Sequence, residues 1–193
     1  LYVLGGTLTA ATVAGTAVNT NYEYDVGGNS VLAKIALPAV SMNRQAVPYE
    51  DTVLYFGGRT ATAAVDTTAN GYSVTLNLAT AAAENPLPAT IAGRVGNALV
   101  IFKPATGMTK LLSIGGFPTI AATTSFLINT GTGSSTNAVH YLNYPFTGAW
   151  AVSPNGLPVS LACGAAALYE DTLYYFGGVQ SFAPGTCQAG VYS

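Results

Sequence analysis

The feature that most constrains the fold is a long internal repeat. Residues 48–58, PYEDTVLYFGG, return 120 positions later as residues 168–178, LYEDTLYYFGG. Shorter versions of the same apolar run with paired glycines occur at residues 1–6 and 110–116. Successive pairs are 52, 58 and 62 residues apart, and a near-constant period indicates repeated structural units. The pairs are Gly5 and Gly6, Gly57 and Gly58, Gly115 and Gly116, and Gly177 and Gly178.

The residues between the glycine pairs predict further strands. An apolar or aromatic segment follows each pair, at residues 22–25, 73–78, 139–143 and 190–192. A third strand is expected at residues 31–38 and 149–152, and a fourth leads back at 41–47 and 160–168. Four short strands in roughly 55 residues are typical of a propeller blade.

We therefore predict an all-β fold, a β-propeller of about four blades, each with four short antiparallel strands. The approximate units are residues 1–40, 41–88, 89–158 and 159–193, and the first and last are incomplete. The run before each glycine pair is continuously apolar, which is typical of a strand buried on both faces. The glycines are expected to end that strand and to admit the backbone of the next blade.

The pattern resembles the kelch repeat. The resemblance is best at Tyr24-Asp25, Leu37-Pro38, Met42, Arg44 and Tyr55-Phe56-Gly57-Gly58, and it covers nearly the whole chain as four degenerate units. Kelch-like rings usually have six or seven blades, so the resemblance implies that this chain is a fragment of a larger propeller. The alternative is that another copy of the chain supplies the missing strands, because unpaired edge strands promote association.

Composition excludes several classes of function. Only 7% of the 193 residues are charged, and the formal net charge is −2. A nucleic-acid surface needs clustered cations, so this class is excluded. The sequence also contains no apolar run of the length that a transmembrane helix needs.

Candidate catalytic residues are few. His140 is the only histidine, and we expect it at the surface or between blades, since zinc and copper sites usually need several His or Cys ligands. The copper radical oxidases, which carry a kelch-type propeller, need more than one His and a modified Tyr–Cys pair. No such set occurs here, so we expect no metal, no cofactor and no catalytic residue within the chain.

Two acidic pairs and one small-residue segment have structural explanations. Glu50-Asp51 and Glu170-Asp171 recur at the same point of two repeats, which predicts polar hairpin turns rather than an active site. Residues 131–135, GTGSS, lack the lysine of a phosphate-binding loop and are expected to form a surface loop.

Cys163 and Cys187, the only two cysteines, are expected to form a disulfide. The two cysteines form no Cys-x-x-Cys motif and belong to no cluster of metal-ligating residues in the sequence. A redox or metal-binding role is therefore not favoured. A disulfide fits an oxidising compartment, so we expect an extracellular, secreted or cell-surface protein.

Two classes of function remain. The first is a non-catalytic propeller that acts in protein–protein interaction or structural assembly, with other subunits or the remaining blades as partners. A carbohydrate-binding propeller is the alternative within this class. The second class is an enzyme, with this chain as the propeller part of a larger secreted protein of the copper radical oxidase kind. Phe146, Trp150 and Phe182 are candidates for contacts with glycans or a protein partner, and packing between blades is the alternative for each.

Overall fold

The computed structural model describes ten segments of the chain. They are residues 2–7, 17–34, 36, 44–50, 52–58, 72–75, 85–86, 94–118, 135–180 and 189–193. For residues 2–7, 17, 72–75 and 85–86 the description is of the backbone alone. Every regular element in these segments is a β-strand.

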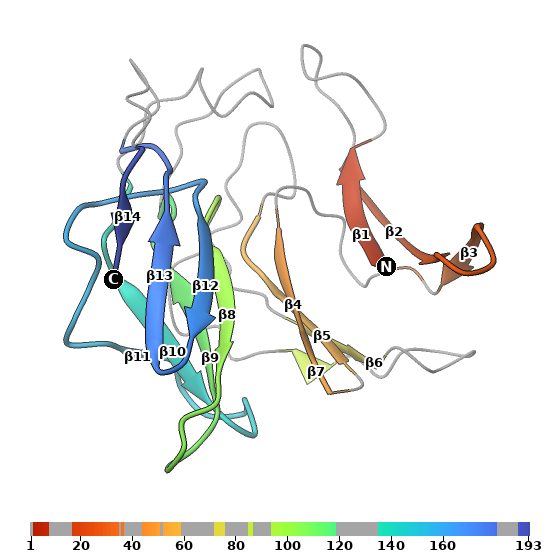
Figure 1. Cartoon of the computed structure of the whole chain (residues 1–193). Helices are drawn as coiled ribbons and strands as arrows, with labels where there is room; N and C mark the ends of the chain where they lie inside the picture. The colour runs from red at the N-terminus through yellow and green to blue at the C-terminus, as the bar shows by residue number, and fades with distance from the viewer. Residues whose placement is uncertain are drawn as a thin grey trace.

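The strands form four small antiparallel sheets that follow one another along the chain, from the red first sheet to the blue fourth sheet in Figure 1. Within each sheet, strands that are consecutive in sequence are also neighbours in space. This up-and-down arrangement makes the protein an all-β protein with a propeller-like architecture. The first sheet contains β1 (Tyr2–Thr7), β2 (Ala17–Asp25) and β3 (Ser30–Lys34).

The other three sheets contain the remaining strands. The second sheet contains β4 (Gln45–Tyr49), β5 (Thr52–Phe56), β6 (Tyr72–Thr75) and β7 (Asn85–Pro86). The third contains β8 (Ala98–Phe102), β9 (Lys110–Ile114), β10 (Val139–Asn143) and β11 (Ala151–Val152). The fourth contains β12 (Ala165–Tyr169), β13 (Thr172–Phe176) and β14 (Val191–Tyr192).

The strand before each glycine pair has the same place in three of the sheets. β5, β9 and β13 are each the second strand, paired on one side with the preceding strand and on the other with the following one. The first strands of neighbouring sheets contact each other, β4 with β8 and β8 with β12. The sheets therefore meet along their first strands, as blades do around a propeller axis.

Glu50, and Glu170 with Asp171, lie in hairpin turns, as the sequence predicts; Asp51 lies outside the described residues. Tyr49 pairs with Thr52, and Tyr169 pairs with Thr172, which leaves two residues for each turn. Glu50 and Glu170 both have φ of 51°. Two-residue hairpins favour such left-handed residues, because their twist matches that of the flanking strands.

Some strand boundaries differ from those expected. Gly5 and Gly6 lie inside β1 instead of ending it, and the register of β1 against β2 shifts between Leu4 and Gly6. β12 begins at Ala165, because Ala162 just before it forms an isolated bridge with Val179.

Candidate docking surface

Each sheet has two faces, which we name by the glycine pair. The forward face carries the residue just before the pair, and the rear face is the opposite one. In the second, third and fourth sheets the defining residues are Phe56, Ile114 and Phe176. Because side chains alternate along a strand, Leu54, Leu112 and Tyr174 lie on the same forward faces.

The second and third sheets pack forward face against rear face. Leu54 and Phe56 on the forward face of the second sheet belong to one core cluster with Leu99, Leu111 and Leu142 on the rear face of the third. All five side chains are buried, and Phe56 has no exposed surface. At about 25 cal/mol per Å² of apolar area, burial of this kind is the main stabilising term between blades.

The third and fourth sheets repeat this packing. Leu112 and Ile114 on the forward face of the third sheet share a core cluster with Tyr175 on the rear face of the fourth. Leu168 and Leu173 of the fourth sheet pack against the same cluster. Ile114 and Tyr175 are both fully buried, so the two interfaces bury equivalent positions.

The glycine pairs at residues 57–58 and 115–116 tie the second sheet to the third and the third to the fourth. The Gly58 N–H donates to the carbonyl of Arg94 at 2.7 Å, and the Gly116 N–H donates to that of Leu161 at 2.8 Å. A Cβ atom on Gly57 would lie 2.3 Å from the Arg94 carbonyl oxygen, and one on Gly115 would lie 2.3 Å from that of Leu161. Only glycine permits both this approach and the positive φ found here.

The fourth sheet leaves the same face open. Phe176 is 43% exposed, although the equivalent Phe56 and Ile114 are fully buried. The Phe176 ring stacks on Tyr174 with centroids 6.4 Å apart, and Tyr169 and Val191 add further exposed apolar surface. No acceptor for the Gly178 N–H occurs among the described residues. The fourth sheet thus exposes an apolar face at positions that the two inner interfaces bury.

The first sheet leaves its rear face open. The register places Leu4, which precedes the glycine pair, opposite Asn21, so the forward face of β2 carries Asn21. Tyr22 lies on the rear face by alternation, opposite Ala33. Tyr22 is 39% exposed, and Val31, on the same face of β3, is 66% exposed. Leu32, on the forward face of β3, is 58% exposed as well. The described part of the chain therefore presents exposed apolar side chains on the rear face of the first sheet and on the forward face of the fourth.

Phe146 and Trp150 pack between sheets, which is the alternative that the sequence left open for both residues. Each retains only 7% exposure. The Trp150 ring lies 5.0 Å from that of Phe56, and the Phe146 ring lies 5.3 Å from that of Tyr49, edge to face. Both residues come from the segment that joins β10 to β11, and they cover the apolar side chains between the second and third sheets. Phe182, the third candidate, lies outside the described residues.

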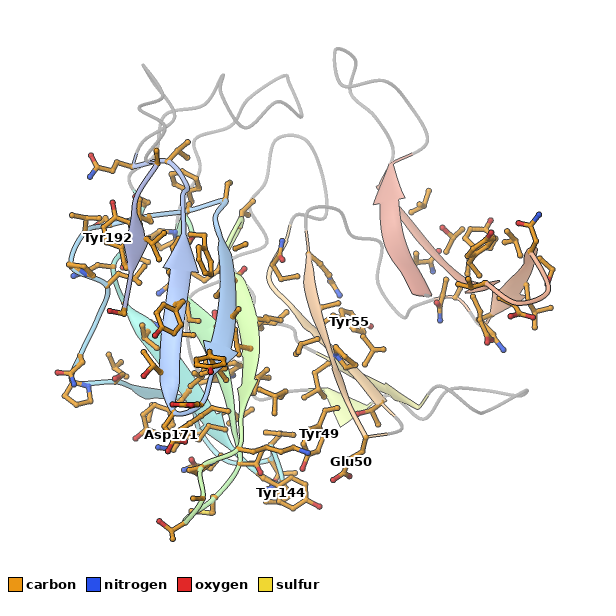
Figure 2. The ribbon with its side chains drawn as sticks, viewed as in Figure 1. Tyr49, Glu50, Tyr55, Tyr144, Asp171 and Tyr192 are labelled. Atoms are coloured by element: carbon orange, nitrogen blue, oxygen red, sulfur yellow. The ribbon has the colours of Figure 1, made fainter. Side chains whose placement is uncertain are left out.

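Tyr49 and Tyr144 lie at the outer end of this aromatic group, beside the β4–β5 hairpin (Figure 2). Their ring centroids are 6.0 Å apart, and Tyr144 is 48% exposed. The Lys103 ammonium lies 5.0 Å from the Tyr49 ring. Burial, together with the hydrogen bond and the charge of neighbouring Glu50, raises the pKa of the Tyr49 phenol above its usual value of 10.0.

His140 lies in a buried polar group on the rear face of the third sheet. It is 7% exposed and pairs with Ser113, whose hydroxyl accepts a hydrogen bond from the Asn97 amide at 3.1 Å. Burial, and secondarily the positive charge of Arg94, lowers the pKa of His140 below 6.5. Burial also lowers the pKa of Arg94. The location between sheets is the one that the sequence favoured.

The described residues contain no group of three or more His, Cys, Asp or Glu side chains close enough to hold a metal ion. Among them there is also no helix that is both long enough and apolar enough to cross a membrane.

Cys163 carries a free thiol and so lends no support to the expected disulfide. Cys187 lies outside the described residues, and the pairing stays a prediction. The Cys163 Sγ packs against Gly96, where a Cβ atom would come within 2.5 Å of it, and burial raises the pKa of the thiol.

A cavity of about 730 Å³ lies between the third and fourth sheets. The described residues that line it include Phe102, Tyr141 and Tyr192, and the polar residues Lys110, Asn155 and Asp171. Nothing in the sequence repeat pointed to this site, because its walls come from strand positions and loops that differ between the units.

The comparisons place the fold among known structures. No protein-family model matches the chain. No curated protein sequence matches it either. A solved structure described as "Structure of YjhT" is similar, with a TM-score of 0.68 and 14% sequence identity over 91% of this chain. The match covers 49% of the YjhT chain, so this chain spans about half the length of that structure. Together with the four antiparallel sheets, this similarity supports the propeller-like fold.

Proposed function

We propose that the protein is a non-catalytic, kelch-type propeller that acts by assembling with other copies of itself outside the cell. The observation that carries this proposal is the exposure of Phe176 on the forward face of the fourth sheet, at a position that is buried in the second and third sheets. Tyr169, Phe176 and Val191 are exposed on this same face, and an exposed apolar patch formed by several side chains is typical of a protein interaction site.

The open forward face favours a propeller sheet as its partner. Both closed interfaces join a forward face to a rear face, and the open face carries the same kinds of residue, with stacked Tyr174 and Phe176 in the place of Leu54 and Phe56. The Gly178 N–H has the position from which Gly58 and Gly116 bind the next sheet. A sheet that docks here would cover the apolar face and would also offer a backbone carbonyl to the Gly178 N–H. A small ligand would not do both.

A second copy of this chain offers the matching surface. Its first sheet presents an open rear face with exposed Tyr22 and Val31. A forward face that binds a rear face is a heterologous contact, which closes into a ring when the rotation permits and otherwise continues into a filament. The formal net charge of −2 gives little repulsion between copies.

The test uses one blocking variant for each face. Phe176→Arg introduces a charge on the forward face, and Val31→Arg introduces one on the rear face. We expect the wild type to self-associate in sedimentation velocity, and each variant alone to remain monomeric. Met108→Arg is the matched control, since Met108 is 58% exposed in the β8–β9 loop and lies on neither face; this variant should associate like the wild type.

The decisive sample is an equimolar mixture of the two blocked variants. Each Val31→Arg copy keeps its forward face and each Phe176→Arg copy keeps its rear face, so the mixture should form dimers and nothing larger. A wild type that stays monomeric up to high concentration contradicts the proposal. Two monomeric variants that do not combine would show that the contact is not head to tail, and would contradict it as well.

A further inference from the structure

We infer that the cavity between the third and fourth sheets is a binding site for a short, uncharged oligosaccharide. This inference is independent of the proposed assembly, because the cavity and the open faces involve different residues. Its volume of about 730 Å³ lies within the range of roughly 300–1,000 Å³ that small-molecule sites occupy.

The residues that line the cavity are spread along the fourth sheet. Asp171 lines it at the β12–β13 hairpin, and Tyr192 lines it in β14, opposite Tyr175. Figure 2 shows these two residues toward opposite ends of the sheet. Tyr175 lies three residues further along β13 than Thr172, which corresponds to about 10 Å of strand. A ligand that contacts both ends must therefore be longer than a single sugar ring.

The walls combine aromatic rings with a few polar groups. Phe102, Tyr141 and Tyr192 supply ring surface, on which the apolar C–H face of a sugar can pack. The Lys110 ammonium lies 4.9 Å from the Tyr141 ring, which holds this donor against the cavity wall. Asp171 contributes a carboxylate that accepts hydrogen bonds from hydroxyl groups, and Asn155 contributes an amide that both donates and accepts.

The charges favour a neutral ligand over an ionic one. One ammonium, from Lys110, and one side-chain carboxylate, from Asp171, line the same cavity, so a polyanion such as a nucleotide would meet repulsion as well as attraction. A purely apolar ligand would leave the carboxylate, the ammonium and the amide without hydrogen bonds, which is unfavourable. An oligosaccharide offers hydroxyl groups for the polar residues and C–H faces for the rings.

The test is calorimetric titration with a panel of neutral oligosaccharides: cellobiose, cellotriose, maltotriose, lactose and chitobiose. We expect at least one to bind, and Asp171→Asn to weaken binding at least about tenfold, because a hydrogen bond to a charged group is lost. Glu170→Gln is the matched control: it changes the neighbouring residue of the same hairpin, which does not line the cavity, and should leave the affinity unchanged.

A second variant tests the aromatic wall. Tyr141→Leu keeps an apolar side chain at a half-buried position and removes the ring, so it should also weaken binding. Asp171 is exposed in a turn, so the Asp171→Asn variant is expected to fold normally. The inference can therefore still be tested with this variant if the Tyr141→Leu variant misfolds. The inference is overturned if no member of the panel binds at millimolar concentration, or if Glu170→Gln weakens binding as much as Asp171→Asn does.

Discussion

The backbone N–H of Cys163 donates to the carbonyl of Gly96 at 2.6 Å, and the two residues occupy equivalent positions in successive repeats. Each follows a residue that forms an isolated bridge, Val95 with Phe117 and Ala162 with Val179. Both have a left-handed backbone, with φ of 68° at Gly96 and 60° at Cys163. The repeat therefore requires a left-handed residue at this corner, and only one of the two positions has glycine.

Replacing Cys163 with glycine should stabilise the reduced protein. A left-handed φ costs about 1–2 kcal/mol for a residue with a Cβ atom, so Cys163→Gly should raise the free energy of unfolding by about 1 kcal/mol. Urea denaturation in the presence of reductant measures the change without any contribution from a disulfide. Cys163→Ala keeps the Cβ atom and should give no gain; an equal gain in both variants would refute the explanation.

Alanine at the first glycine of a pair should be strongly destabilising. Gly57→Ala and Gly115→Ala each place a Cβ atom 2.3 Å from a carbonyl oxygen of the next sheet, at positive φ. Overlap and backbone strain together should lower the free energy of unfolding by about 3 kcal/mol. Gly148→Ala is the control, since a Cβ atom there meets nothing within 4 Å, and it should change stability little. Similar losses in all three variants would argue against the role of the pair.

His140 should make stability depend on pH below neutrality. Its pKa in the folded protein lies below the unfolded value of about 6.5, so the unfolded chain binds more protons as the pH falls from 7. The free energy of unfolding should therefore decrease with falling pH, by at most about 1.4 kcal/mol per unit, until the folded pKa is passed. Because His140 is the only histidine, His140→Asn should remove this part of the slope between pH 7 and 5. Parallel pH profiles for the two proteins would contradict the prediction.

Removing the Trp150 ring should destabilise the fold. This side chain is 7% exposed and packs on Phe56, so Trp150→Ala should cost about 3–5 kcal/mol in denaturant unfolding. Tyr144→Ala, at a ring that is 48% exposed, should cost much less. A Trp150→Ala protein with wild-type stability would show that the ring is not part of the core between the sheets.

The sequence predicts the strands that carry the repeat well, because their signal is local. The apolar runs at β5, β9 and β13 end at glycines whose positive φ and tight contacts the structure shows directly. The strands near Tyr24, His140 and Tyr192 were likewise expected. The repeat does not predict β8, because no repeated motif accompanies this strand. Its apolar run alone does not show that it pairs with β9.

The candidate surface could not be predicted, because exposure depends on the neighbouring sheet. Phe56 and Phe176 have nearly identical local sequences, yet one is fully buried and the other 43% exposed. For Trp150 the sequence left both an exposed contact and packing between blades open, and the ring packs on Phe56 of the neighbouring sheet. The cavity at Asp171 and Tyr192 also needs two sheets, and no single repeat contains its walls.

The place of the third sheet between two packed neighbours has a consequence for folding cooperativity. Its first strand, β8, contacts both β4 and β12, so the energetic coupling among the second, third and fourth sheets passes through the third. In a nearly one-dimensional array, a unit with two coupled neighbours opens less often than a unit with one. Among these three sheets, the third should thus open last, so that native-state amide exchange is slower in β9 than in the second and fourth sheets.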